Sequence, residues 1–261
     1  MSNQGNPMCA FAQINGLELY YEVHGSGSPL VLIHGGGSTI ESTFGYLLPT
    51  FARSHRVIAV ELQAHGRTKD IDRPLSFEQD ADDVAALLQH LQIDQADFLG
   101  FSNGGTTCLQ LGIRHPTLVR KLVLASAIFR RSGMPPNFFD GFDQATIAML
   151  PEPLKQAYLK VNPDPAGLQA MFERDTARMR SFQDIRDEDI RSITAATLVI
   201  NGDAEMVLAS HALELAQTLP QARLAILPSG HGDYLGELMS AEHASQLPAL
   251  VATMIEEFLA A

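Results

Sequence analysis

A serine stands between two glycines in Gly100-Phe101-Ser102-Asn103-Gly104, which matches the pattern G-x-S-x-G. The motif joins an apolar run at residues 97–101 to a helical pattern at residues 106–114. At such a junction a sharp turn lifts the serine out of the sheet, and glycines are needed where side chains would collide with neighbouring elements. We therefore predict that Ser102 is a nucleophile.

A serine hydroxyl needs a base that takes its proton, and in chains with this motif the base follows the serine. Four histidines follow it here: His115, His211, His231 and His243. The first ends a helical pattern, and the second and fourth lie within such patterns, where solvated or capping side chains are expected. His231 lies in a Gly-His-Gly loop after the last predicted strand, at the sheet edge where ligands bind. We predict that His231 is the base.

The base in turn needs a carboxylate that holds its tautomer and stabilises the imidazolium. One strand end between Ser102 and His231 offers suitable acids, in Ile200-Asn201-Gly202-Asp203-Ala204-Glu205. Asp203 and Glu205 cannot both point at one imidazole, and the residues alone leave the choice open. The other acid is expected to cap the following helix.

The negative oxygen of a tetrahedral intermediate needs donors that are already aimed at it. The backbone N–H of Asn103 follows the nucleophile and opens a helix, whose positive end favours an anion. The second predicted donor is the backbone N–H of Gly36, in the loop after the apolar run at residues 30–33. His34 is expected to brace this loop rather than to react.

The remaining chain alternates strands and helices. An Asn15-Gly16 turn predicts a hairpin of residues 11–14 and 17–23. Further strands are predicted at residues 30–33, 57–60, 97–101, 119–125, 197–200 and 222–227, and helices at residues 41–51, 76–91, 106–114, 209–219 and 241–259. The strands are apolar on both faces and alternate with helices. This predicts an α/β fold with a mostly parallel central sheet and helices on both faces.

Residues 129–191 interrupt this alternation of strands and helices. They show no strand pattern, carry six prolines and gather methionine and phenylalanine. We interpret residues 129–192 as a helical insertion into an α/β core formed by residues 1–128 and 193–261.

Composition restricts the class of protein. The 261 residues are 46% hydrophobic and 18% charged, so a full-sized core can be buried. A net charge of −12 repels phosphate backbones and anionic membrane surfaces, so neither nucleic acid nor membrane is an expected partner. Two cysteines form no disulfide framework, and no signal-peptide pattern opens the chain. We therefore expect a cytoplasmic protein. Because the usual metal-site spacings are missing, we expect no metal or cofactor.

In order along the chain, these residues resemble the motifs of the α/β-hydrolase superfamily of serine hydrolases. The matching segments are His34-Gly35-Gly36, His65-Gly66-Arg67-Thr68, the serine motif, the acid after Gly202, and Gly230-His231. In this family the acid lies three residues after that glycine, which makes it Glu205, although Asp is commoner there. The turn before His65 usually begins with Asp and has Gly before its His-Gly pair. This chain has Glu61 and Ala64, and the alanine requires a milder turn or backbone strain.

The resemblance implies that residues 129–192 form a helical cap over the active site. The methionines and phenylalanines of the insertion favour an apolar acyl or aryl pocket, or they serve only to hold the cap on the sheet. The first hypothesis is a carboxylesterase-like enzyme that cleaves a small, apolar ester or lactone through an acyl-enzyme. Ser102, His231 and Glu205 would be catalytic, with Gly36 and Asn103 as backbone donors to the oxyanion.

Other functions fit the same residues. C–C bond hydrolysis and cofactor-free perhydrolysis use the same triad, and a non-catalytic receptor would bind a small molecule in the same pocket. A nicotinamide-dependent enzyme is disfavoured, because Ile40 stands where the third glycine of a dinucleotide fingerprint starting at Gly35 is needed. The expected partner is a small-molecule substrate, and the sequence is compatible with a homo-oligomer.

Overall fold

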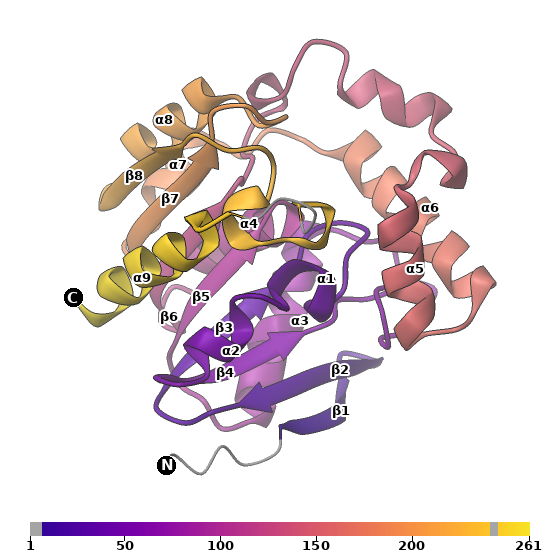
Figure 1. Ribbon diagram of the computed structural model, residues 1–261, viewed down its shortest axis with the longest axis horizontal. Coiled ribbons are helices and arrows are strands. Elements are labelled where there is room, and N and C mark those ends of the chain that lie inside the picture. The colour runs from indigo at the N-terminus through magenta and orange to yellow at the C-terminus, as the bar shows by residue number, and fades with distance from the viewer. Residues whose placement is uncertain (1–6, 241–244) are drawn as a thin grey trace.

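A computed structural model describes residues 7–240 and 245–261. Its centre is a sheet with the strand order β1-β2-β4-β3-β5-β6-β7-β8 (Figure 1). The strands are β1 Met8–Ile14, β2 Leu17–His24, β3 Ser28–Ile33, β4 His55–Val60, β5 Ala96–Phe101, β6 Val119–Ala125, β7 Ala196–Gly202 and β8 Ala222–Leu227. The β1–β2 and β2–β4 pairs are antiparallel, and the pairs from β4 to β8 are parallel. The predicted α/β fold is confirmed.

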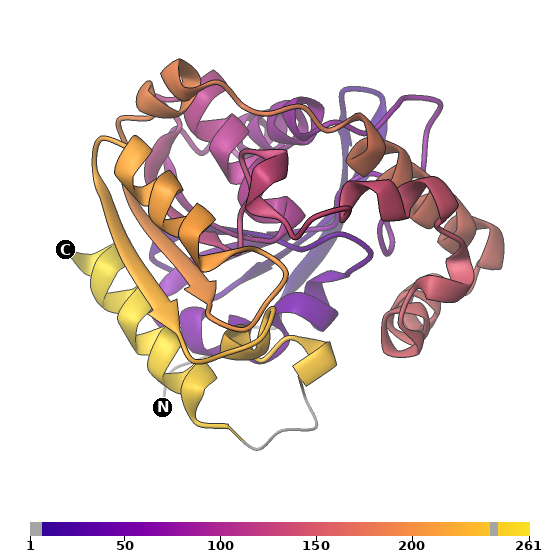
Figure 2. The same ribbon diagram turned by 90° about the horizontal axis from the view of Figure 1, so that it is seen from above.

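The buried strands contribute side chains to two hydrophobic cores, one on each face of the sheet. Val31 and Ile33 of β3 belong to one core, and Leu30 and Leu32 belong to the other. Successive side chains of a strand point to opposite faces, which explains why these runs are apolar at every position. Helices cover both faces, as Figure 2 shows from above.

The first core is covered by α3 Phe77–His90, α4 Asn103–Arg114 and α8 Ala209–Thr218. The second is covered by α1 Ile40–Phe44, α2 Leu48–Phe51 and α9 Leu247–Ala260. The helix α3 starts as predicted, because the Ser76 side chain accepts a hydrogen bond from the Gln79 backbone N–H.

The predicted hairpin is also present. Asn15 and Gly16 both adopt positive φ, at 49° and 82°, which is the backbone that a two-residue turn of this kind requires.

The helix predicted at residues 41–51 is instead two short helices, α1 and α2. Pro49 lies in the first turn of α2. A proline lacks an N–H and clashes with the carbonyl four residues earlier, so it cannot continue α1 but can open a new helix.

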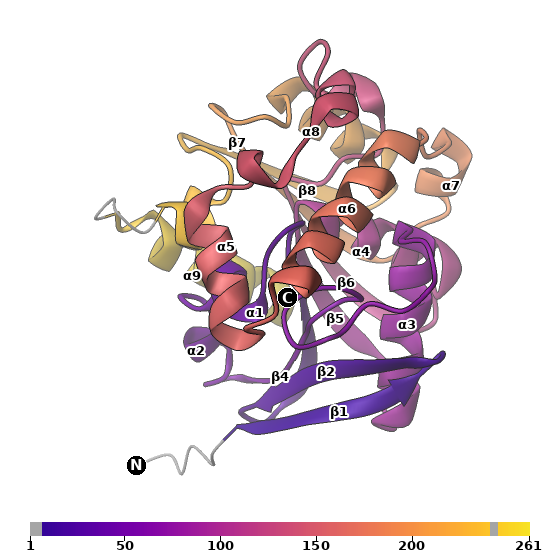
Figure 3. The same ribbon diagram turned by 90° about the vertical axis from the view of Figure 1, so that its right-hand side faces the viewer.

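The insertion contains α5 Glu152–Val161, α6 Pro165–Ser181 and α7 Asp187–Arg191, with the 3-10 turns η1 Arg131–Gly133, η2 Phe139–Gln144 and η3 Ile147–Met149. Figure 3 shows α5 and α6 on the side of the molecule that faces the viewer. Phe129 and Ile190, near the two ends of the insertion, pack into the first core. The insertion is therefore anchored to the sheet at both ends.

The C-terminal part begins with the 3-10 turns η4 Asp233–Leu235 and η5 Leu238–Ser240. The last helix was predicted from residue 241, but residues 241–244 lie outside the described ranges and α9 begins at Leu247. His243 lies outside them too. Across the described ranges, no helix is long and apolar enough to cross a bilayer.

Candidate active site

Ser102 lies in the turn between β5 and α4, in a strained backbone conformation. Its φ and ψ are 53° and −118°, a region that non-glycine residues rarely occupy. The turn depends on both flanking glycines. A Cβ at Gly100 would lie 2.1 Å from the Gly104 carbonyl oxygen, and a Cβ at Gly104 would lie 2.1 Å from that of Ile33. The strained, tightly packed turn holds the serine at the carboxyl end of the sheet.

Neighbouring strands end beside it. Ser126 follows β6, Glu205 lies three residues after β7, and His231 lies four residues after β8. These strands are parallel, so their carboxyl ends share one edge of the sheet. Residues that are far apart in the sequence therefore come together by topology alone.

Glu205 is the acid that reaches His231. Its Oε2 lies 2.5 Å from His231 Nδ1, while its Oε1 accepts hydrogen bonds from the Gly202 backbone N–H (2.6 Å) and from Ser126 Oγ (2.8 Å). The Glu205 side chain is fully buried. Asp203 points elsewhere, because its Oδ1 accepts from the Ser229 backbone N–H at 3.0 Å. The expectation that the second acid caps the following helix was wrong, because the N-cap residue of α8 is Leu208. With Nδ1 donating to Glu205, the lone pair of His231 is left on Nε2.

Ser102 and His231 line one cavity. The His231 ring packs against Phe101, with ring centroids 4.7 Å apart. Among the described residues, Ser102 Oγ has no hydrogen-bond partner within 3.5 Å, so the geometry brings serine and base to one pocket without closing a hydrogen bond between them. Catalytic hydrogen bonds of this kind often tighten only when substrate is bound.

The two predicted oxyanion donors face the same cavity. Gly36 and Asn103 both line it, and a Cβ at Gly36 would lie 2.4 Å from Asn103 Nδ2, so the two loops are in contact. Within the described ranges, neither backbone N–H has a protein acceptor. As the first residue of α4, Asn103 has no partner for its N–H within the helix.

His34 supports this loop, as expected. Its Nε2 accepts a hydrogen bond from the Leu62 backbone N–H (3.1 Å), and its Nδ1 donates to the Gly35 carbonyl (2.7 Å). Burial lowers the pKa of His34 to about 3, and the neighbouring His65 adds to this effect. A neutral His34 can both donate and accept, as these two contacts require.

The turn after β4 is strained rather than mild. Ala64 has φ of 67°, a conformation that favours glycine. Glu61 holds the turn together, because its Oε2 accepts from the Arg67 backbone N–H (2.6 Å) and its Oε1 pairs with Arg67 Nη1 (2.9 Å).

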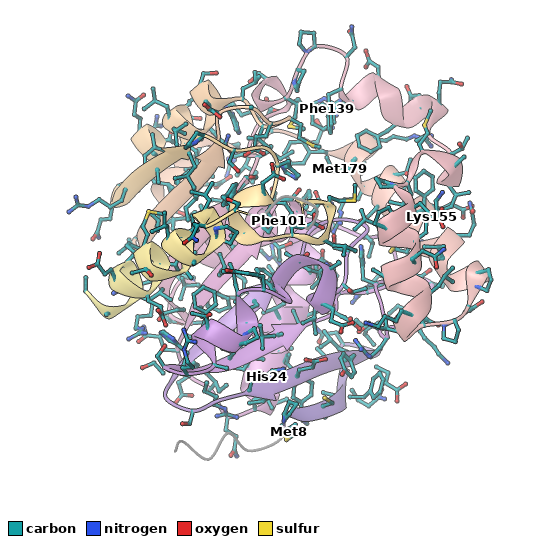
Figure 4. All side chains as sticks on the ribbon, viewed as in Figure 1. Met8, His24, Phe101, Phe139, Lys155 and Met179 are labelled. Atoms are coloured by element: carbon teal, nitrogen blue, oxygen red, sulfur yellow. The ribbon has the colours of Figure 1, made fainter. Side chains whose placement is uncertain are left out.

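The cavity has a volume of about 450 Å³ and is mostly apolar. The insertion contributes Met134, Phe138, Phe142, Leu150, Leu154, Met171, Phe172 and Met179 to its wall. Phe139 and Met179, labelled in Figure 4, lie in the half of the molecule away from His24 and Met8 of the N-terminal strands. Of the residues described, no three histidine, cysteine, aspartate or glutamate side chains are grouped so as to hold a metal ion.

A family model described as the alpha/beta hydrolase fold matches residues 28–188. The chain belongs to the α/β-hydrolase family. It is 29% identical over 256 residues to the 2-hydroxymuconate semialdehyde hydrolase of a Pseudomonas species, covering 89% of this chain and 88% of the relative. It is 26% identical over 252 residues to a non-heme haloperoxidase of Rhodococcus erythropolis, covering 84% and 90%. A solved structure of an N-acyl homoserine lactone degrading enzyme is 25% identical, with a TM-score of 0.73 and coverage of 94% and 98%.

This α/β-hydrolase has further residues at the candidate site that no sequence motif predicted. Ser126, at φ of 52°, donates to Glu205 and is 2.7 Å from the hydroxyl of the buried Tyr234. Burial raises the pKa of Tyr234 well above its usual value, so its hydroxyl stays protonated. The position of Ser126 directly after a buried strand was the available signal. The sequence held no signal for Tyr234, because its contact with Ser126 depends on how η4 packs against the core.

His115 and His211, the other described histidines that follow Ser102 in the α/β-hydrolase, do not line the cavity. His115 Nε2 is 2.7 Å from Asp82 Oδ1 at the partly exposed end of α4. His211 differs from the expectation of a solvated or capping side chain. It is 2% exposed, stacks on Phe129 with ring centroids 4.6 Å apart, and accepts a hydrogen bond from the Phe129 backbone N–H through Nε2. The expectation was wrong because Phe129, at the start of the insertion, packs on His211 of α8 and buries it.

Proposed function

We propose that this α/β-hydrolase cleaves a small, neutral carboxylic ester or lactone with an apolar acyl portion. Ser102 attacks the carbonyl carbon, and His231 Nε2 takes the serine proton while Glu205 holds the imidazole. The backbone N–H groups of Gly36 and Asn103 stabilise the oxyanion. The alcohol leaves with the proton that His231 returns, and water, activated by His231, then hydrolyses the acyl-enzyme.

The observation that carries this proposal is the chemistry of the cavity wall. Apart from the catalytic groups, most of the lining consists of methionine, phenylalanine and leucine side chains. A pocket of this kind binds apolar groups by burying them from water, and methionine adapts to irregular shapes. We propose that the insertion is a cap that supplies the acyl pocket.

Charge distinguishes this proposal from C–C bond hydrolysis. Among the described residues, no lysine or arginine lines the cavity, and residues 1–6 and 241–244 contain neither. The lining carboxylates are Asp175 and Glu237. Burying the carboxylate of a substrate without a cation beside it would cost on the order of 3–5 kcal/mol. The substrate named for the Pseudomonas relative, 2-hydroxymuconate semialdehyde, carries a carboxylate, and this cavity offers that group no cation.

Two matched substrates test the proposal. p-Nitrophenyl butyrate is neutral, and mono-p-nitrophenyl glutarate has a similar length but ends in a carboxylate. We expect wild type to hydrolyse the neutral ester with a kcat/KM at least about tenfold higher, which corresponds to about 1.4 kcal/mol in transition-state binding. Ser102→Ala should abolish turnover of both esters. Preference for the glutarate, or turnover of a dienoate in the absence of ester turnover, would contradict the proposal.

A further inference from the structure

A carboxylate from the insertion reaches the loop that carries the proposed oxyanion donor. Asp175 lies on α6, and its Oδ2 accepts a hydrogen bond from the Gly37 backbone N–H at 2.7 Å. A Cβ at Gly36 would lie 3.1 Å from the same Oδ2. Gly37 has φ of 66°, so the chain turns sharply here. Asp175 therefore fixes the orientation of the peptide between Gly36 and Gly37.

A buried histidine meets the same carboxylate. His65 Nδ1 lies 2.9 Å from the Gln63 carbonyl, which can only accept, so Nδ1 carries a proton. His65 Nε2 lies 3.0 Å from Asp175 Oδ2. Burial alone would lower the pKa of His65, but the charge and the hydrogen bond of Asp175 outweigh it and raise that pKa. His65 and Asp175 thus form an ion pair beneath the oxyanion loop.

Arg178 extends this pair into a buried cluster of four charges. It lies one turn after Asp175 on α6, pairs with Asp175 Oδ1, and places Nη1 2.7 Å from Oδ2 of Asp80 on α3. The side chains of Arg178 and Asp80 are each 2% exposed. Burial would raise the pKa of Asp175, but Arg178 and His65 outweigh it and lower that pKa, so Asp175 is ionised.

Stability alone gives little reason for such a cluster. Replacing a buried ion network by apolar side chains is often neutral or stabilising, because desolvation of the charges is costly. The location offers a better reason. A lone carboxylate beside Gly36 would repel the negative charge that develops on the substrate oxygen. Two cations, His65 and Arg178, offset that charge while Asp175 keeps its hydrogen bond to the loop.

We infer that Asp175 is a positioning residue for the oxyanion hole. From α6 it holds the Gly36–Gly37 peptide so that the Gly36 N–H faces the carbonyl oxygen of the substrate. The oxyanion hole is then complete only when the insertion is docked on the core. This inference rests on the proposed function, because it assumes acyl transfer at Ser102.

Two variants of Asp175 separate its charge from its hydrogen bond. Asp175→Ala removes both, whereas Asp175→Asn keeps an acceptor for the Gly37 N–H and loses the charge. The matched control is Arg174→Gln. Arg174 lies on the same helix and joins the insertion to the core through Asp70 (Nε to Oδ2, 2.8 Å), without contact to the oxyanion loop.

Three measurements are made on each purified full-length variant. The first is the separate kcat and KM for p-nitrophenyl butyrate. The second is the affinity for an alkylboronic acid, which forms a tetrahedral adduct with an active serine. The third is amide hydrogen exchange over residues 34–38, followed by mass spectrometry, which requires no turnover.

For Asp175→Ala we expect kcat to fall about 10²-fold, as for the loss of an oxyanion donor, with KM within about threefold. The affinity for the boronic acid should fall along with kcat, and the backbone amides of residues 34–38 should exchange their hydrogens faster. Asp175→Asn should be intermediate, and it remains informative where Asp175→Ala does not fold. Arg174→Gln should match wild type in kcat and in exchange over this segment.

Two results would overturn the inference. Equal changes of kcat and KM in the Asp175 and Arg174 variants would mean that Asp175 only docks the insertion. Unchanged exchange over residues 34–38 in both Asp175 variants would mean that it does not hold the loop. If wild type shows no ester turnover, the proposed function fails, yet the exchange experiment still decides whether Asp175 positions the loop.

Discussion

The carboxylate of Glu205 lies 2.5 Å from Nδ1 of His231, and its other oxygen accepts two further hydrogen bonds. Three donors therefore fix a fully buried carboxylate on one side of the imidazole. A longer side chain than aspartate suits this loop, because the acid must reach both the histidine and Ser126 after β6.

Glu205→Gln should lower kcat/KM strongly. An amide N–H facing Nδ1 would favour the wrong tautomer of His231, and the corresponding change in a Ser-His-Asp enzyme lowers kcat about 10⁴-fold. Asp203→Asn, the matched control, should lower it less than about threefold, since among the described residues the Asp203 carboxylate bonds only to the Ser229 backbone N–H. Steady-state kinetics with a p-nitrophenyl ester measures both. The reverse ranking would assign the acid to Asp203.

Gly104→Ala should destabilise the protein, because the added Cβ would lie 2.1 Å from the Ile33 carbonyl oxygen. Backbone must move to relieve such a contact, at a cost of about 2 kcal/mol or more. Gly141→Ala is the control, since a Cβ there meets no atom within 4 Å, and a change within about 0.5 kcal/mol is expected. Urea denaturation gives both free energies of unfolding. Equal stability of the two variants would mean that α4 does not pack tightly on β3.

The sequence was informative where local pattern and tertiary role coincide. The interior strands are apolar runs in the sequence, and the serine motif marks its own turn, so β3 to β7 and the turn that carries Ser102 were predicted closely. The split between α1 and α2 was missed, although Pro49 was its visible cause. The prediction placed Ala64 in either a milder turn or a strained one, and φ of 67° shows strain.

The sequence did not predict the role of a residue whose partners lie far away along the chain. Asp175 is one of two acidic residues on α6, with Glu173, and only the docking of α6 brings it to Gly37 and His65. Ser126 likewise meets Glu205 through strand order, and Tyr234 meets Ser126 through the packing of η4. The choice between Asp203 and Glu205 needed coordinates for the same reason, because two side chains of one loop differ only in direction.

A cation at the cavity should change the preference for substrate charge. Met206 lines the cavity and is 42% exposed, so Met206→Lys keeps its ammonium partly solvated. We expect the kcat/KM ratio of mono-p-nitrophenyl glutarate to p-nitrophenyl butyrate to rise about tenfold, or about 1.4 kcal/mol. Met149→Lys is the matched control, because Met149 is 65% exposed and does not line the cavity. The same rise in both variants would mean that the net charge of the protein, and not a cation at the pocket, causes the change in preference.

Stability should fall on acidification because of His211. Burial is the main cause that lowers its pKa to about 4 from 6.5, with Arg130 adding to the effect. Its Nε2 must stay unprotonated to accept from the Phe129 N–H. The unfolded chain therefore binds more protons between these pH values. This contribution is fully present above pH 6.5 and is lost as pH falls towards about 4, by roughly 3 kcal/mol at most.

His211→Gln tests this origin, because an amide oxygen can still accept from Phe129 while it does not titrate. We expect the variant to have a flatter dependence of unfolding free energy on pH between about 4 and 6.5. His90→Gln, at an exposed position on α3, should follow wild type. Urea unfolding at several pH values gives the slopes. If His211→Gln loses stability as steeply as wild type over this range, the acid sensitivity comes from other groups and the buried, neutral state of His211 does not control it.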